Sequence, residues 1–393
     1  MISIDKLKFS PKEEEIRNKM ISLKQEAGSH SPSIHTLTQL IPGLSIKIDA
    51  CFLSNPYATE LYMDYFKREI LNKNKLRDLL EFYPSQNDVI AFLLSSSINV
   101  DSKQIFIGNG AIEIIQAIIH RYAKKKMVVN IPTFSSYYEF AQGIVDIEFF
   151  KLKKDNNYNL NVDEYIDFIK KVRPDTIVLI NPNNPTGNYI LKADLIRILT
   201  ELSFVENIII DESFIHFAFE DEFYSEVTLS KLVEEQKNLY IVKSMSKDFG
   251  IAGIRAGYAI MAEYKVKELL KNGYLWNSNG LAEHFFRLYS QKDFVSNYQI
   301  ARKRYIEETQ KFIIDISKVP NIKVYPSSAN FVLIELPDGI SSELITSILL
   351  IRYGIYVRNC DDKIGLEGNY LRIASRGQQD NQSIIDVLMD LFN

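Results

Sequence analysis

The pattern of hydrophobic and polar positions divides the chain into regions of different texture. Residues 12–26 read as an exposed amphipathic helix, followed by the polar stretch AGSHSPS. From about residue 105 to 261, short β-branched runs (MVVNI, TIVLI, NIIID) alternate with helical stretches such as 110–123 and 191–203. Strands that alternate with helices predict a mostly parallel sheet with helices on both faces. We therefore expect a large α/β domain here.

The pattern after residue 285 predicts a smaller α+β domain. A long charged helix over 292–318 precedes the strand-like runs IKVYP, ANFVLIEL, IYVRN and NYLRIAS, with a helix expected at 341–353 and another at the end. Three parts follow from these changes. They are an N-terminal segment contributing to the small domain and the site entrance (1–50), a large cofactor-binding domain (51–285) and a small C-terminal domain (286–393).

Composition excludes several classes of protein. The 393 residues are 46% hydrophobic and 24% charged, as is usual for a globular chain with a sizeable core. The net charge of −4 gives no basic footprint, so no nucleic-acid partner is expected. Cys51 and Cys360 lie far apart in the sequence, which predicts neither a disulfide framework nor a metal site. The charged start and the lack of a long apolar run predict a cytoplasmic protein without membrane contact.

Several motifs place polar groups at strand ends, where open α/β sheets bind ligands. FIGNGAIE ends a strand and begins a helix, so its backbone N–H groups could meet an anion, although a plain tight turn fits equally well. LINPNNPTG forms an irregular turn that presents Asn184 as a side-chain donor. IIIDESF puts Asp211 directly after a buried strand. That carboxylate needs a cationic partner, unless it only caps a helix.

Lys247, in the stretch KSMSKDFGIAGIRAGY, supplies such a cation. A lysine can form a Schiff base with an aldehyde cofactor, and a carboxylate can keep a pyridinium nitrogen protonated. Other side chains could hold the phosphate and the ring of that cofactor: Ser244, Ser246, Arg255 and Phe134. Together these residues predict a pyridoxal 5′-phosphate site. A Lys–Asp ion pair without cofactor is the competing interpretation.

With NPNNPTG, DES, SMSK and an arginine eight residues after the lysine, the chain resembles the class I/II aminotransferase family of fold-type-I pyridoxal-phosphate enzymes. The resemblance runs from about residue 30 to the end. It implies a seven-stranded, mostly parallel sheet between helices, plus a small α+β domain. It also implies Lys247 as the Schiff-base lysine, Asp211 on the pyridine nitrogen and Asn184 on the phenolic oxygen. The implied phosphate ligands are Ser244, Ser246, Arg255 and the amides of Asn109 and Gly110.

The same resemblance implies a homodimer with active sites at the subunit interface. Tyr83 of EFYPS would reach the cofactor phosphate of the partner subunit. A tyrosine packed in the core is the alternative interpretation of Tyr83.

The reaction depends on which bond at Cα stands perpendicular to the cofactor ring. A transaminase presents Cα–H and anchors the carboxylate, whereas a decarboxylase presents the bond to the carboxylate. Arg358 and Arg372 fall in strands of the small domain and suit a carboxylate or a phosphate, with surface ion pairing as the alternative. A phosphorylated substrate needs further donors, which His30 and Ser31 could supply. His30 could equally be an ordinary surface residue.

Phe214 separates two subgroups of the family. Histidinol-phosphate aminotransferases have a tyrosine at this position, whereas threonine-phosphate decarboxylases have a phenylalanine in a DEAF-like string. The chain also resembles the decarboxylases in VYPSSANF, in LWNSNGLA (275–282) and in the spacing of residues 358–381. It departs from them at Leu53, where they have an asparagine, and at His216, where they have an acidic residue. Leu53 alters the expected substrate pocket and leaves room for the smaller serine phosphate.

We therefore predict a carbon–carbon lyase that decarboxylates an O-phospho-amino acid. L-Serine phosphate would give ethanolamine phosphate, and L-threonine phosphate would give 1-aminopropan-2-ol phosphate. Lys247 is the expected acid that returns a proton to Cα. The expected substrate-binding residues are His30, Ser31, Leu53, Asn184, Arg358 and Arg372. Two alternatives remain: an aminotransferase that uses glutamate and a phosphorylated substrate such as histidinol phosphate, and a non-catalytic pyridoxal-binding protein.

Overall fold

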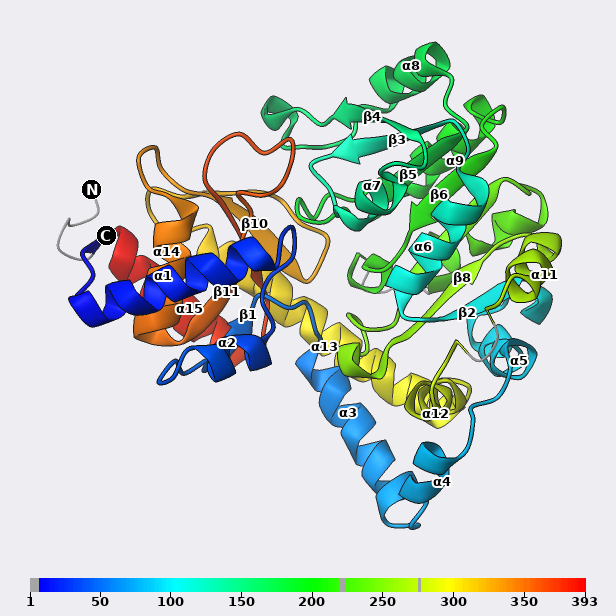
Figure 1. Ribbon diagram of the computed structural model, residues 1–393, viewed down its shortest axis with the longest axis horizontal. Helices are drawn as coiled ribbons and strands as arrows, with labels where there is room; N and C mark the ends of the chain where they lie inside the picture. The colour runs from blue at the N-terminus through cyan, green and yellow to red at the C-terminus, as the bar shows by residue number, and fades with distance from the viewer. Residues whose placement is uncertain (1–6, 219–223, 275–276) are drawn as a thin grey trace. The chain divides into compact units, whose positions relative to one another are not determined.

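The computed structural model describes residues 7–218, 224–274 and 277–393, which fall into two compact units (Figure 1). Leu275 and Trp276 of the LWNSNGLA motif, and the first six residues of the N-terminal segment, lie outside the described residues. The units are divided after Leu53 and after Arg304, which lies inside helix α13 (Lys292–Ile316). Unit 1 contains Met1–Leu53, Pro185–Gly187 and Tyr305–Asn393, and unit 2 contains Ser54–Asn184 and Asn188–Arg304.

Unit 2 is built on a seven-stranded sheet in the order β2-β8-β7-β6-β5-β3-β4. Strand β8 runs antiparallel to both of its neighbours, and the other neighbouring pairs are parallel. The expected mostly parallel sheet is thus confirmed. The strands are β2 (Ile105–Asn109), β3 (Lys126–Ile131), β4 (Asp146–Lys151), β5 (Thr176–Ile180), β6 (Asn207–Asp211), β7 (Leu239–Ser244) and β8 (Ala256–Ile260).

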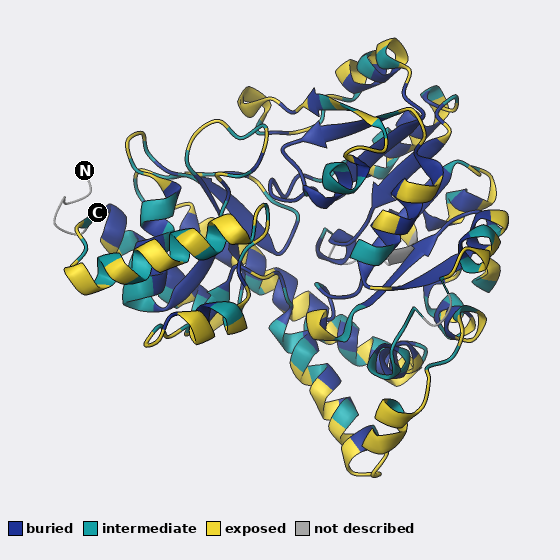
Figure 2. Cartoon of the chain, viewed as in Figure 1, coloured by how far each residue is buried: buried dark blue, intermediate teal, exposed yellow. Residues whose placement is uncertain are grey.

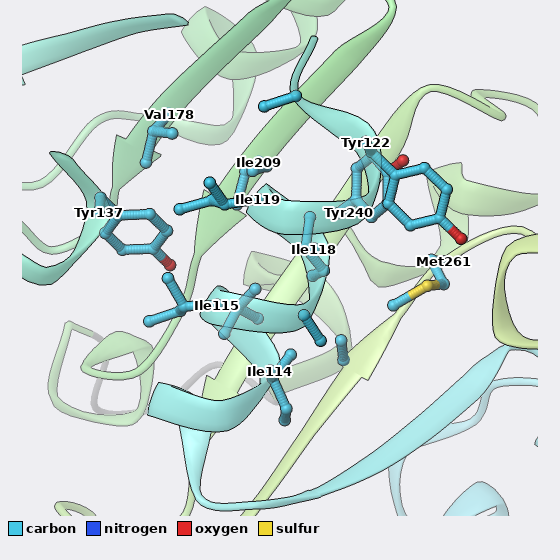
Figure 3. Packing of buried hydrophobic residues seen from close by; sticks show 14 of the residues in the cluster. Ile114, Ile115, Ile118, Ile119, Tyr122, Tyr137, Val178, Ile209, Tyr240 and Met261 are labelled. Carbon is cyan, nitrogen blue, oxygen red and sulfur yellow. The ribbon is translucent and has the colours of Figure 1, made fainter. Parts of the chain in front are cut away.

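The central strands of this sheet form continuous buried runs, because helices cover both faces (Figure 2). Helix α6 (Ala111–Tyr122) shows how one face is covered. Its isoleucines recur at helical spacing and pack with Val178 of β5 and Ile209 of β6 (Figure 3). The other helices of unit 2 are α3 (Pro56–Phe66), α4 (Leu76–Glu81), α5 (Asn87–Ile98), α7 (Ser136–Ala141), α8 (Val162–Val172), α9 (Lys192–Glu201), α10 (Tyr224–Val227), α11 (Glu263–Lys271) and α12 (Gly280–Tyr289).

Unit 1 has a five-stranded sheet in the order β1-β11-β12-β10-β9. Helix α1 (Pro11–Glu26) begins at a capping box, in which the Ser10 side chain and Glu13 bond to each other's backbone N–H. Its residues are intermediate or exposed, which fits the expected surface helix. The strands are β1 (Ile48–Ala50), β9 (Lys323–Val324), β10 (Phe331–Glu335), β11 (Ile355–Asn359) and β12 (Tyr370–Ala374), and the other helices are α2 (Ile34–Leu40), α14 (Ser342–Ile348) and α15 (Gln378–Phe392).

Across the described parts of both units, no helix combines the length and the apolar character that a membrane crossing requires.

Candidate active site

A cavity of about 150 Å³ lies in unit 2 where β5, β6 and β7 end. The ends of neighbouring parallel strands share one edge of the sheet, so residues distant in the sequence meet there. The cavity brings together most of the side chains expected to bind the cofactor: Phe134, Asn184, Asp211, Ser244, Ser246, Lys247 and Arg255. Phe214 also lines it.

Asp211 is the buried carboxylate of this cavity, with 5% of its surface exposed. The hydroxyl of Tyr137 donates to its Oδ2 at 2.9 Å, and the backbone N–H of Ser213 donates to its Oδ1 at 2.8 Å. Burial raises the pKa of Asp211, while these donors and the charge of Lys247 pull it down. Burial also holds the pKa of Tyr137 well above its usual value, so its hydroxyl remains a donor.

Tyr137 was not among the site residues expected from the sequence. The only available signal was its position close to Phe134 in IPTFSSY, which does not reveal a bond to a carboxylate 74 positions away.

Lys247 follows β7 in a segment whose backbone is fixed on both sides. Its carbonyl accepts from the backbone N–H of Asn55 at 2.9 Å and from that of Gly250 at 3.3 Å. Gly250 has a φ of +64°, and a side chain there would collide with Thr59 and the carbonyl of Asn55. The Thr59 hydroxyl in turn donates to the carbonyl of Gly250 at 2.8 Å. The helix start at α3 therefore holds the segment that carries the lysine.

The phosphate-binding end of the cavity depends on close backbone approach. A Cβ at Gly110 would lie 2.7 Å from Arg255 Nη2, and a Cβ at Gly257 would lie 2.8 Å from the backbone nitrogen of Ala111. Arg255 itself adopts a φ of +61°, an unusual conformation for a residue other than glycine. Ala111 and Ile112 line the cavity at the N-terminus of α6, where first-turn amides have no acceptor within the helix.

The amides of Asn109 and Gly110 already have acceptors in this structure. The Asn109 amide donates to Glu113 Oε2 at 2.7 Å, and that of Gly110 donates to the Gly108 carbonyl at 2.8 Å. Their expected role as phosphate ligands therefore stays a prediction.

The residues of the cavity fit a pyridoxal phosphate. A buried carboxylate suits a protonated pyridine nitrogen, a lysine suits an aldehyde, and an arginine beside two serines and a helix N-terminus suits a phosphate. Asn184 supplies an amide, whereas Phe214 supplies no donor.

Arg358 and Arg372 form a second cluster, in unit 1. They are Cα partners across the antiparallel strands β11 and β12, so their side chains share one face of the sheet. Only 5% and 8% of their surfaces are exposed, which contradicts simple surface ion pairing. Arg372 Nη2 donates to the carbonyl of Cys51 at 2.6 Å. Arg358 Nη2 donates to the Asp362 carboxylate at 2.6 Å and to the carbonyl of Ser29 at 2.7 Å.

Asp362 is shared among several cations of this cluster. Its Oδ2 also lies 3.7 Å from Lys24 Nζ and 3.6 Å from Lys363 Nζ. Burial lowers the pKa of Arg372, Lys24 and Lys363, because a charged form loses hydration there. A concentration of partly desolvated cations is the environment in which a phosphate or carboxylate binds well.

Ser31, Leu53 and His30 are the remaining expected substrate ligands, and all three lie in unit 1. Ser31 Oγ is 3.2 Å from the Cys51 thiol, next to the carbonyl that binds Arg372. Leu53 is buried, whereas His30 is exposed and its carbonyl accepts from Lys24. Their roles stay predictions.

Tyr83 lies between α4 and α5 and is 85% exposed in the single chain. This exposure contradicts the alternative of a tyrosine packed in the core.

Comparisons with known proteins agree with the geometry. Residues 73–387 match the family Aminotransferase class I and II. An L-serine phosphate decarboxylase of Campylobacter jejuni is 54% identical over 386 residues, covering 98% of this chain and 99% of that protein. One from Sulfurospirillum multivorans is 47% identical and covers 94% of this chain and 95% of its own.

A solved structure of a decarboxylase from Sulfurospirillum multivorans superposes with a TM-score of 0.92 at 46% identity, covering 97% of each chain. These matches confirm the expected fold and the expected nearness to amino acid phosphate decarboxylases. This chain therefore belongs to the class I and II aminotransferase family.

Proposed function

We propose that this chain decarboxylates O-phospho-L-serine to ethanolamine phosphate and carbon dioxide, with pyridoxal 5′-phosphate bound at Lys247. One observation carries the proposal: the 54% identity that extends over nearly the whole of a relative named L-serine phosphate decarboxylase. The buried arginine pair of unit 1 and the cavity of unit 2 support it, because they offer separate places for the substrate phosphate and for the cofactor.

The cofactor, when bound, would supply an electron sink for the electron pair released as the bond between Cα and the carboxylate breaks. Asp211, held by Tyr137 and Ser213, would keep the pyridine nitrogen protonated. Asn184 would donate to the phenolic oxygen, a bond that Phe214 cannot make. Arg255, Ser244 and Ser246 would hold the cofactor phosphate.

Arg358 and Arg372 would bind the phosphate of the substrate. Arginine pairs hold a phosphate through several charge-assisted bonds, so the substrate would be anchored by its phosphate and not by its carboxylate. An unanchored carboxylate can take the position from which it leaves. Lys247 Nζ would then donate the proton that replaces it at Cα.

A homodimer is also part of this proposal, with Tyr83 reaching the cofactor phosphate of the partner subunit. Leu80, Phe82, Tyr83 and Phe92 are 73%, 64%, 85% and 71% exposed in the single chain and come from α4, α5 and the loop between them. Large exposed apolar side chains of this kind suit a surface that a partner covers. Phe82→Glu should shift the sedimenting species to a monomer, and an unchanged species would contradict the dimer.

The decisive experiment incubates the protein, loaded with pyridoxal 5′-phosphate, with O-phospho-L-serine or O-phospho-L-threonine and without any keto acid. Mass spectrometry follows carbon dioxide and the product amine. We expect catalytic release of carbon dioxide, faster from the serine compound. If carbon dioxide is absent and glutamate with a keto acid instead yields 2-oxoglutarate, the chain is an aminotransferase and the proposal is wrong.

A further inference from the structure

A buried cluster of charged and polar side chains lies directly next to Lys247 in the sequence and is not used by the chemistry above. Asp248, Lys243, His216 and Tyr298 form this cluster, and each is at most 2% exposed. Lys243 Nζ lies 2.5 Å from Asp248 Oδ2, and His216 Nδ1 lies 3.0 Å from the same oxygen. His216 Nδ1 is also 2.8 Å from the hydroxyl of Tyr298.

The cluster joins segments that line the cofactor cavity. Asp248 follows Lys247, Lys243 precedes Ser244, and His216 lies two residues beyond Phe214. The carboxylate of Asp248 therefore connects the lysine segment both to strand β7 and to the segment that follows Asp211. Helix α13 closes the group through Tyr298 and through Arg302, whose Nη1 donates to the His216 carbonyl at 3.0 Å.

Aromatic packing at the next residue, Phe249, also fixes this segment. Phe249 stacks on Tyr298 with ring centroids 4.0 Å apart, and it contacts Phe285 and Tyr289 of α12 with centroids 5.0 Å away in each case. Asp248 and Phe249 are thus fully buried. Lys247, which lies between the end of β7 and these two residues in the chain, lines the cavity. A residue that is followed by two such packed neighbours and preceded by a strand of the sheet has little freedom to move its Cα.

The protonation states are consistent with a neutral group as a whole. Burial and the charges of Lys243 and Arg302 hold the pKa of His216 well below its usual value, so the imidazole is uncharged. Burial raises the pKa of Asp248, and Lys243 opposes that rise. A single ion pair with a neutral histidine leaves these four side chains without net charge.

Apolar side chains could fill this space without the cost of removing charges from water. Stability alone therefore does not explain why an ion pair is buried here. We propose that Lys243, Asp248, His216 and Tyr298 are positioning residues that fix Lys247 and Phe214 at the cofactor cavity. The inference rests on the proposed role of Lys247 in binding pyridoxal phosphate.

The main test is the double variant Lys243→Met with Asp248→Asn, which removes both charges together and leaves an amide at position 248 that can still bond to His216. We expect a melting temperature close to that of the parent protein, because no buried charge is left unpaired. We expect kcat to fall about 10- to 100-fold with KM changed less than about 3-fold, as for a misplaced reacting group. The pH at which the cofactor absorbance changes should also shift.

Tyr298→Phe provides a milder test that keeps the packing on Phe249. Its matched control is Tyr165→Phe in α8, because the buried Tyr165 hydroxyl has no hydrogen-bond partner among the described residues. We expect Tyr298→Phe, and not the control, to lower kcat and shift the absorbance titration. If the double variant does not fold, this pair of variants decides the question.

Folded variants with the parent's kcat and absorbance titration would overturn the positioning role, even if their melting temperatures change. Failure of the proposed function gives a different result. If the chain is not the decarboxylase, the parent protein releases no carbon dioxide from O-phospho-L-serine. If Lys247 does not carry the cofactor, Lys247→Ala keeps the cofactor absorbance of the parent protein. Neither result follows if only the positioning inference is wrong.

Discussion

The cofactor cavity of unit 2 and the arginine cluster of unit 1 hold buried charge in opposite ways. In the cavity, the Asp211 carboxylate has its own donors from Tyr137 and Ser213 and also feels the charge of Lys247. In the cluster, Arg358 and Arg372 face each other as like charges, and the Asp362 carboxylate is shared with two lysines. The cavity sets one carboxylate against Lys247 and Arg255, whereas in the cluster two arginines and two lysines surround one carboxylate, an excess of positive charge that an anion would neutralise.

Changes in the cavity should therefore affect the chemistry, and changes in the cluster should affect substrate binding. Each charged group of the cavity would have its own role toward the cofactor, whereas a cationic cluster mainly contributes attraction for an anion.

The largest effect is expected for Lys247→Ala. We expect kcat for carbon dioxide release to fall by at least about 10³-fold, because both the covalent attachment and the proton donor at Cα are removed. The absorbance band of the bound cofactor should disappear as well. Lys237→Ala, at an exposed lysine of unit 2, serves as the control and should keep full turnover. Retained turnover in the Lys247 variant would contradict the assignment of this cavity.

Next in size is the effect of Arg358→Lys or Arg372→Lys on substrate binding. Lysine keeps the charge but loses the planar fork, so KM for O-phospho-L-serine should rise about 10- to 100-fold. Cofactor absorbance should be unchanged, since these residues belong to the other unit. Arg352→Lys is the matched control in unit 1, where Arg352 pairs with Glu13 at 2.8 Å. An equal KM in all three variants would remove the cluster from the substrate site.

Inorganic phosphate offers a direct comparison of the two regions in the cofactor-free protein. A ligand that binds only the folded chain raises its melting temperature. At 100 times its Kd, such a ligand adds about 2.7 kcal/mol to the free energy of unfolding. We expect the stabilisation to fall in part with Arg255→Gln and in part with Arg358→Gln. If only the Arg255 variant reduces it, the cluster of unit 1 does not bind phosphate.

A smaller effect, on stability and its pH dependence, is expected for Asp211→Asn in the cofactor-free protein. The pKa of Asp211 is raised in the folded chain, so the unfolded chain loses this proton first as the pH rises. The free energy of unfolding therefore falls as the pH rises from the pKa of Asp211 in the unfolded chain to its pKa in the folded chain. It stays lower at higher pH. Asn should restore roughly 1 kcal/mol at neutral pH, the usual size of a single-residue effect. Urea unfolding at several pH values measures this, and a destabilised variant would contradict it.

An effect of similar size, on cofactor affinity, should follow Tyr137→Phe, which removes one donor from Asp211. A hydrogen bond to a charged group contributes about 1.5–3 kcal/mol. The bond from the Ser213 N–H to Asp211 remains in this variant and limits the loss. We expect the cofactor to bind about 5- to 50-fold more weakly, in line with that range, as measured by equilibrium titration of absorbance. Tyr165→Phe is again the matched control, and equal affinities in both variants would leave Tyr137 without a role.

Much of the fold followed from local pattern. The alternation of β-branched runs with amphipathic helices predicted the large sheet. The change after residue 285 predicted strands β9 to β12 of the second sheet, to which β1 adds a fifth strand. Contiguous motifs also identified Asn184, Asp211 and Lys247, because each motif encodes both a strand end and the polar residue placed there.

Other features could not be predicted in this way. The Tyr137–Asp211 bond, the Arg358–Arg372 pair and the Asp248–His216 contact each join residues from different elements. His216 stands out in the sequence only as a departure from the decarboxylase motif, because its contact with Asp248 depends on the packing of segments 32 positions apart.

By itself, the sequence determined the elements, the family and the chemistry at the ends of β5, β6 and β7, since turn geometry and strand ends depend on nearby residues. The tertiary structure alone decided which buried charges share a partner. Strand register places Arg358 opposite Arg372, and close packing of β7 and α13 around Asp248 brings Lys243, His216 and Tyr298 within bonding distance. Such contacts depend on a few ångströms of position, which no pattern along the chain encodes.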